Sequence, residues 1–197
     1  NNGATPVASG IIGNAWDFDG VNDYVTGLNN YDFSTGYTYS FWINHALKNY
    51  SIPLQSNYGN VSNNPYMVTY SNANWYVNAQ QANGVLTANV WQHLAVTCTG
   101  TTLTMYLDGV SGNTHPSLCT DGTVGSTHMF LGAGNNQSSP VDGSIDELSF
   151  WGRGLTSSEV TTLYNSGNGN PPSALSNLSE LQGYYNFEQT GNTLTNM

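Results

Sequence analysis

Carboxylate side chains gather in one short stretch near the start of the chain, and they favour calcium binding. Asp17, Asp19 and Asp23 lie close together among turn-forming residues, and Asp146 could join them from a distant strand. Calcium is held by about six to eight oxygen atoms from carboxylates, amides and backbone carbonyls. The alternative is that these Asp residues only shape turns through hydrogen bonds to nearby backbone groups.

Amide side chains gather in a second stretch, NNQSSPVDG at residues 135–143. Asn135, Asn136 and Gln137 lie there close to Asp142. Amide oxygens are also calcium ligands, so this loop is a second candidate calcium site. The same alternative applies, because Asx residues commonly form turns without any ligand.

Aromatic side chains in the middle of the sequence indicate sugar binding. Aromatic rings pack against the apolar faces of pyranose rings, while amides and hydroxyls bind the ring OH groups. The candidates come from a region rich in aromatics: Tyr50, Tyr58, Tyr70, Trp75 and Tyr76. Aromatic residues are also ordinary strand formers, so each of them could simply be part of a sheet.

Catalysis is not favoured by the sequence. Glycoside hydrolysis needs two carboxylates flanking the scissile bond, about 5–5.5 Å apart for retention and wider for inversion. Asp146 and Glu147 are adjacent, and adjacent strand residues project to opposite faces. Glu159 is explained by a helix cap, and no Gly-x-Ser-x-Gly nucleophile pattern occurs. We therefore expect that the protein is not an enzyme.

Charge restricts the partners. The 197 residues carry a formal net charge of −10, and Lys48 and Arg153 are the only two basic residues. Nucleic acid and anionic membrane surfaces are therefore unfavourable partners. No apolar run approaches the roughly 18 residues that span a bilayer, so we expect no membrane insertion. Abundant Asn, Ser, Thr, Gly and Tyr are typical of an extracellular, cell-surface or virion-surface protein.

The chain has two cysteines, Cys98 and Cys119, and two interpretations stay open. An extracellular location favours a disulfide between them. The alternative is one buried and one exposed thiol. A metal site is disfavoured because the nearby His93, His115 and His128 lack the close spacing of metal ligands.

Alternating apolar and polar residues predict strands through most of the chain. The clearest is 37–46, with Tyr37, Tyr39, Phe41 and Ile43 on the core face and Trp42 on the other. Further strands are predicted at 66–70, 74–79, 90–98, 103–107, 128–134 and from 142 onward, whereas 49–64 is predicted to be a polar loop.

A short helix is predicted after the last of these strands. Thr156 and Glu159 have the spacing of a capping box, Val160 and Leu163 fall at helical spacing, and Gly167 is placed for a left-handed end. Residues 168–180 are predicted to be a linker, and residues 181–187 return to a strand pattern.

Over about residues 11–166 the chain resembles the laminin-G-like, concanavalin A-like jelly-roll family, in the branch that also resembles pentraxins. The resemblance rests on six segments in order: WDFDGVNDYV, YSFWI, VWQHLAVTCTG, LTMYLDGV, LGAGN and GSIDELSFWGRGLTSSEV. It implies an all-β fold, a two-sheet antiparallel jelly-roll β-sandwich with one short helix. It also implies that residues 135–137 correspond to the calcium-binding loop of pentraxins, with amides replacing acidic residues.

We expect a single domain over 1–197, in which 181–197 supplies a C-terminal strand. Family members commonly open with a strand similar to GYYNFEQTGNT, which stands here at the end. It either completes this sandwich or begins a following repeat. The expected function is that of a non-catalytic module of a larger surface or fibre protein, which binds a glycan or glycoprotein with calcium and contacts neighbouring domains. The alternatives are a structural spacer and a glycoside hydrolase.

Overall fold

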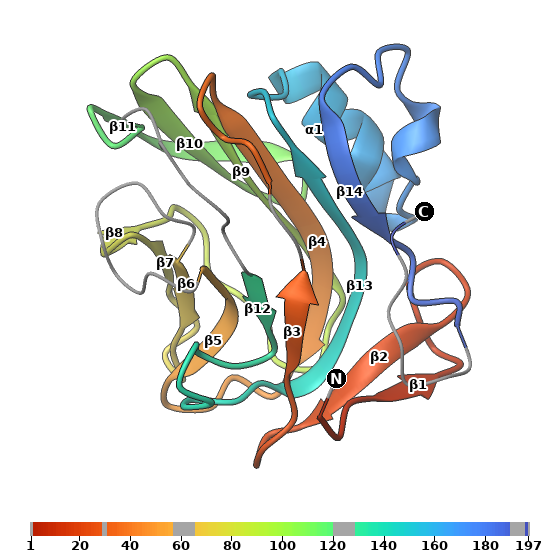
Figure 1. Ribbon diagram of the computed structural model, residues 1–197. Helices are drawn as coiled ribbons and strands as arrows, with labels where there is room; N and C mark the ends of the chain where they lie inside the picture. The colour runs from red at the N-terminus through yellow and green to blue at the C-terminus, as the bar shows by residue number, and fades with distance from the viewer. Residues whose placement is uncertain (1, 29–30, 57–65, 120–128, 190–195, 197) are drawn as a thin grey trace.

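The computed structural model describes residues 2–28, 31–56, 66–119, 129–189 and 196, and these form two packed antiparallel sheets (Figure 1). The fold class expected from the sequence, a jelly-roll sandwich with one short helix, is confirmed. The larger sheet contains, in order, β1 (Thr5–Val7), β2 (Ala15–Asp19), β13 (Asp142–Trp151), β4 (Tyr37–His45), β9 (Gln92–Thr99), β10 (Thr102–Leu107) and β11 (Val110–Pro116), with β14 (Leu181–Tyr185) beside β13. The smaller sheet contains β3 (Val25–Leu28), β12 (Met129–Leu131), β5 (Ser51–Ser56), β6 (Tyr66–Thr69), β7 (Trp75–Val77) and β8 (Gln80–Gln81).

The main core fills the space between the two sheets. Strand β4 contributes Tyr37, Tyr39, Phe41 and Ile43 to it, as the alternating pattern predicted. Trp42 points to the opposite side of the larger sheet, where its ring packs 5.7 Å from that of Tyr164 (centroid to centroid). The larger sheet therefore carries apolar side chains on both faces, so its outer face also needs a cover.

That cover is provided by Val160 and Leu163 of α1 (Ser157–Tyr164) and by Leu175, which follows the 3₁₀ turn Pro172–Ala174. A second 3₁₀ turn, Asn165–Gly167, comes directly after α1. The predicted capping box is present, because the Thr156 side chain accepts from the Glu159 backbone N–H. The prediction that Gly167 ends the helix was wrong. The left-handed cap is Asn165, with φ 48°, and Gly167 belongs to the following turn.

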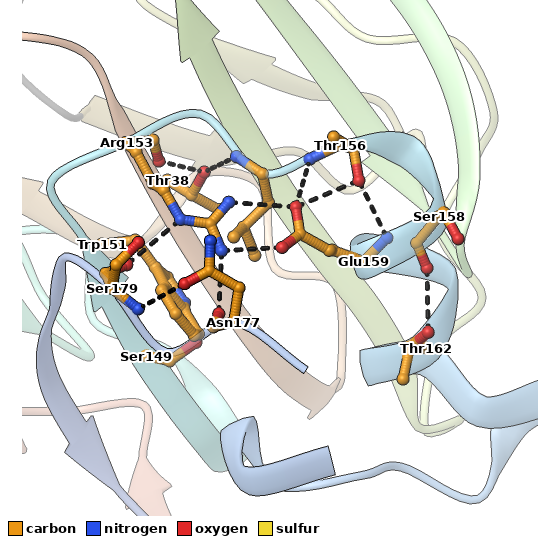
Figure 2. Close-up of polar contacts among 11 residues, drawn as sticks. Thr38, Ser149, Trp151, Arg153, Thr156, Ser158, Glu159, Thr162, Asn177 and Ser179 are labelled. Atoms are coloured by element: carbon orange, nitrogen blue, oxygen red, sulfur yellow. Dashed lines mark hydrogen bonds and ion pairs between the residues drawn. The ribbon is translucent and has the colours of Figure 1, made fainter. Parts of the chain in front are cut away.

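Arg153 fastens the helix to the segment that leads into β14 (Figure 2). Its guanidinium donates two hydrogen bonds to the Glu159 carboxylate, at 3.0 and 2.7 Å, and others to the backbone carbonyls of Asn177 and Ser179. It also lies 5.3 Å from the ring centroid of Trp151. Residues 168–180, predicted to be a linker, are therefore packed against the domain in this structure.

Strands from the N-terminal and C-terminal parts of the chain lie one after the other along one edge of β13. That edge pairs with β2 through residues 142–145 and with β14 through residues 148–151, while the other edge pairs with β4. The ladder is irregular where the neighbour changes, and Glu147 there adopts φ 54°. Asp146 accepts hydrogen bonds from the backbone N–H groups of Ile11 and Ile12, at 2.9 and 3.1 Å.

Side chains of the C-terminal segment enter the main core. Phe187 is fully buried, and its ring meets that of Trp16 edge-on at 5.9 Å. The hydroxyl groups of Tyr185 and Tyr31 are hydrogen-bonded at 2.7 Å. These contacts give β14 and the residues after it a large share of the packing at the β13 edge.

Cys98 and Cys119 are joined in a disulfide, as one of the two interpretations of the sequence held. The bond links the end of β9 to the segment after β11, across a separation of 21 residues. Among the residues that the structure describes, no helix is long and apolar enough to cross a membrane.

Candidate sugar-binding pocket

A pocket of about 220 Å³ lies between the smaller sheet and residues 135–143, which we call the amide-rich loop. Its lining consists of uncharged residues: Tyr50, Ile52, Gln55, Tyr66, Asn135, Asn136 and Ser138. Pockets for drug-sized ligands measure roughly 300–1,000 Å³. The pocket therefore suits a ligand about the size of one sugar ring, contacted by phenol, amide and hydroxyl groups.

Strands β5 and β6 place two of the lining residues on the outer face of the smaller sheet. Gln55 and Tyr66 are directly opposite each other in the ladder, and their neighbours Leu54 and Met67 point into the core. The prediction that residues 49–64 form a polar loop was wrong for β5, where Pro53 weakens the strand signal. Sequence reasoning missed Gln55 for that reason, whereas Tyr66 could have been found from the alternation of YMVTY.

The amide-rich loop has its conformation fixed by its own hydrogen bonds. The Gly134 N–H donates to the Ser138 carbonyl at 2.9 Å, and the Ser138 hydroxyl donates to Asn136 Oδ1. The Asn135 N–H donates to Gln55 Oε1 at 3.1 Å, which ties the loop to β5. A Cβ at Gly134 would lie 2.9 Å from Gln55 Oε1, so a larger residue there would have to displace the Gln55 amide. The pocket wall is therefore preorganised, which lowers the entropic cost of binding.

Two tyrosines form the other wall. Tyr50 is 37% exposed, and its hydroxyl is hydrogen-bonded to that of Tyr66. Burial, followed by this hydrogen bond, raises the pKa of Tyr66 above its ordinary value. The Tyr66 hydroxyl therefore stays neutral at physiological pH and can exchange hydrogen bonds with a sugar hydroxyl.

The structure divides the predicted sugar-binding residues into three groups. Tyr50 lines the pocket, and Tyr70 and Tyr76 extend an aromatic cluster from it. The prediction was wrong for Trp75, whose side chain is fully buried in the main core. Adjacent strand residues face opposite sides of a sheet, so Trp75 points into the core while Tyr76 points to the outer face. Tyr58 lies outside the described residues.

Members of the two predicted calcium stretches meet on neighbouring strands. Asp19 of β2 lies directly opposite Asp142 of β13. Lys48 Nζ is 3.3 Å from Asp142 Oδ2 and donates to the Gly20 carbonyl at 3.1 Å. Backbone hydrogen bonds from Val21 and then Asn22 are the main causes that lower the pKa of Asp19, with Lys48 adding a smaller electrostatic effect. An ammonium group thus already compensates charge between these two carboxylates.

The remaining candidate ligands mostly hold the backbone in place. Asp23 accepts from the Asp19 N–H and Asp17 accepts from the Ser144 hydroxyl, both at 2.9 Å. Asp146 is fully buried and bonded to backbone N–H groups, and Gln137 occupies a left-handed turn position with φ 63°. Over the described ranges, no three acidic, histidine or cysteine side chains gather in a way that could hold a metal ion.

The carboxylates of Asp146 and Glu147 are shut off from solvent. The regular alternation expected for them is broken by the left-handed conformation of Glu147, whose carboxylate accepts the Tyr184 hydroxyl at 2.9 and 2.8 Å. Burial is the main cause that raises the pKa of Asp146 to about 7 and of Glu147 to about 8, with Glu188 adding repulsion. A polysaccharide could not reach this pair in the described conformation.

Ser40 and His93 have residue types that catalysis could use, but they too are covered. Ser40 Oγ lies 2.7 Å from His93 Nε2 on the outer face of the larger sheet, in a space that Leu163 of α1 also lines. His93 is 1% exposed, and burial lowers its pKa to about 3. The imidazole is therefore neutral at physiological pH and takes part in packing beneath the helix.

Two antiparallel sheets packed face to face define a jelly-roll β-sandwich. A family model described as the concanavalin A-like lectin/glucanases superfamily matches residues 19–161. The chain belongs to this superfamily, in which the sequence resemblance also placed it. A search of curated proteins found no significant match.

Several solved structures share this fold at low sequence identity. A heptameric SAP-like pentraxin from Limulus polyphemus is 13% identical, with a TM-score of 0.63 over 92% of this chain and 90% of the pentraxin. Domain 4 of the extracellular arabinanase AbnA from Geobacillus stearothermophilus, solved with arabinotriose, is 20% identical, with a TM-score of 0.64 over 82% and 81% of the two chains. A Trypanosoma rangeli sialidase is 15% identical, with a TM-score of 0.60 over 85% of this chain and 30% of the sialidase. The fold thus occurs both in enzymes and in proteins of other kinds.

Proposed function

We propose that the protein is a non-catalytic carbohydrate-binding module that holds one sugar ring in the pocket between Tyr66 and the amide-rich loop. The observation that carries this proposal is the set of neutral amide, hydroxyl and phenol groups around a space of about 220 Å³. The likeness to a domain solved with arabinotriose supports it, as does the superfamily itself.

The module is proposed to act outside the cell or on a cell or virion surface. The disulfide between Cys98 and Cys119 supports this location, because such bonds persist in oxidising compartments. Its proposed partners are a glycan or glycoprotein and neighbouring domains of a larger surface or fibre protein.

A glycan-array screen of the purified protein, followed by titration of the best hits, tests the sugar-binding proposal. We expect Tyr66→Ala to weaken binding at least tenfold, because it removes one wall of the pocket. Tyr24→Ala serves as the matched control, since Tyr24 is half-buried and does not line the pocket. Absence of binding to every glycan would instead favour the structural spacer.

Calcium is proposed to bind weakly at residues 135–142. Asn135, Asn136, Gln137 and Asp142 would supply the oxygen ligands, but Asn136 Oδ1 is already bonded to Ser138 and Asp142 is paired with Lys48. This donor set fits only a weak site, in the roughly 10⁻⁴–10⁻³ M range of extracellular modules. When bound, calcium would supply a coordination point for sugar hydroxyls.

Thermal melting at increasing calcium concentration tests this site. At a calcium concentration ten times Kd the free energy of unfolding should rise by about 1.4 kcal/mol, which raises the Tm by a few degrees. Asp142→Ala should abolish this rise. Lys48→Met should produce the same rise at a lower calcium concentration, because the Asp142 carboxylate loses its ammonium partner. An unaltered rise in Asp142→Ala would place calcium elsewhere.

A further inference from the structure

Four tyrosines continue from the pocket across the outer face of the smaller sheet. This tyrosine row consists of Tyr66, Tyr50, Tyr70 and Tyr76. The rings of Tyr50 and Tyr70 meet edge-on at 5.3 Å, and those of Tyr70 and Tyr76 at 5.2 Å. The Tyr76 hydroxyl donates to Gln81 Oε1 at 3.2 Å, which carries the row to β8. The cluster is continuous from the pocket to the far strand of the sheet.

The strand register explains why this row faces outward. Tyr76 is opposite Val68 in the ladder, and the alternate residues Met67, Trp75 and Val77 fill the main core. Tyr66, Tyr70 and Tyr76 are each only partly buried. The outer face of the larger sheet, by contrast, lies beneath α1 (Figure 1). The smaller sheet therefore presents the row on a face that α1 does not cover.

The row and the pocket lining are made entirely of uncharged side chains. Burial raises the pKa of both Tyr66 and Tyr70, so neither phenol ionises at physiological pH. The two basic residues of the chain are engaged elsewhere, Lys48 with Asp142 and Arg153 with Glu159. A net charge of −10 also repels polyanions over a distance. Among the described residues of the row and the pocket, an acidic sugar would find no counter-charge.

From these observations we infer that the pocket is the terminal subsite of a longer site for neutral, unbranched oligosaccharides, whose further rings lie along Tyr50, Tyr70 and Tyr76. This inference rests on the proposed sugar-binding function and specifies its ligand class. Phenol edges and faces contact the apolar sides of successive rings, while the hydroxyl of Tyr76 and the amide of Gln81 bond to sugar OH groups. Affinity therefore grows with the length of the sugar chain.

Calorimetric titration with oligosaccharides of defined length tests this inference. The neutral probes are arabinose, xylose and glucose with their linear trisaccharides arabinotriose, xylotriose and cellotriose, and the acidic probe is sialyllactose. For the series that binds, the trisaccharide is expected to bind about tenfold more tightly than the monosaccharide. Sialyllactose is expected to bind more weakly than any neutral trisaccharide of that series.

Two variants separate the row from the pocket. Tyr70→Ala and Tyr76→Ala should remove most of the tenfold gain for the trisaccharide and lower monosaccharide affinity by much less, with circular dichroism used to confirm that each variant is folded. Tyr24→Ala should change neither affinity. Equal affinity of wild type for monosaccharide and trisaccharide, or tighter binding of sialyllactose, overturns this inference while the single-ring pocket stands. Absence of binding by every probe overturns both the pocket and the row.

Discussion

Deletion of residues 175–197 is expected to abolish cooperative folding of the domain. The deletion removes β14 from the edge of β13, so backbone groups of Leu148–Trp151 lose their partners and the main core is opened beside Trp16. Exposed strand edges also pair readily with other chains, so the truncated protein should aggregate. Circular dichroism and thermal melting provide the measurement, and an unchanged Tm would contradict the expectation.

A single substitution tests the same edge without removing backbone. Phe187 is fully buried, and Phe187→Ala is expected to cost about 3–5 kcal/mol. The whole domain is stabilised by only about 5–15 kcal/mol, so this loss is a large fraction. Leu178→Ala is the matched control, because Leu178 is 46% exposed and its loss should change stability by less than about 0.5 kcal/mol. Urea unfolding of the three proteins gives both values.

Rescue in trans separates loss of the strand from a general loss of stability. A synthetic peptide of residues 175–197, added to the truncated protein, is expected to restore the thermal transition with saturable dependence on peptide concentration. The same peptide carrying Phe187→Ala should restore it poorly. Recovery with both peptides alike would mean that the backbone ladder, rather than the Phe187 contact, determines docking.

The second large effect is expected on raising the pH. Asp146 and Glu147 are buried, have pKa values raised to about 7 and about 8, and are repelled by the Glu188 carboxylate. His93 lines the same space as Glu147, but burial lowers its pKa to about 3, so it carries no compensating charge at pH 5–9. A carboxyl group with a higher pKa in the folded state binds its proton more tightly when folded. The contribution of this pair is therefore fully present below about pH 4 and is lost as pH rises through 7 to 8.

The difference between Glu147→Gln and wild type isolates this contribution. Glutamine keeps an oxygen that can accept the Tyr184 hydroxyl but cannot ionise. We expect the variant to match wild type within about 1 kcal/mol at pH 5 and to be more stable by about 4 kcal/mol at pH 9. Urea unfolding at both pH values measures the gap. A gap that stays constant would show that burial does not hold a proton on Glu147.

The comparison with a variant is needed because two buried imidazoles act in the opposite direction. His45 and His93 have pKa values lowered to about 4 and about 3, mainly by burial. Their contribution is present above about pH 6.5 and is lost as pH falls, because the unfolded chain then binds protons first. Glu159→Gln is the matched control. Hydrogen bonds from Arg153 lower the pKa of Glu159 to about 2, so its gap from wild type should be constant between pH 5 and pH 9.

The fold was largely predictable from the sequence because its strands and helix carry strong local signals. Strand β4 alternates without interruption, and the Thr156 and Glu159 capping box fixes the start of α1. Strand β5 was missed because Pro53 and the polar residues around it hide a short alternation that only tertiary packing stabilises. Trp75 was misassigned because composition counts aromatics without assigning their faces, and the register with β6 decides them.

The pocket was only half predictable. Tyr50, Asn135 and Asn136 stood out by residue type, but they are far apart in sequence and were assigned to different chemistries, sugar and calcium binding. The Asn135 N–H bond to Gln55 brings the two sets together, and such a contact depends on how β12 and β5 are paired. The irregularity at Glu147 also had no sequence signal, because it arises where β13 exchanges one neighbouring strand for another.

Strand β14 has a consequence for how the protein is made. The ribosome synthesises β13 well before Phe187. The Phe187 side chain can pack only after it has itself emerged from the exit tunnel. Until then the nascent domain holds an open groove beside Trp16 and lacks the Tyr184 hydroxyl for Glu147. Because β2, β13 and β14 join segments far apart in the chain, their assembly is also slow. The domain therefore cannot complete its core before the segment with Phe187 is available, and chaperones that shield open sheet edges should increase its yield.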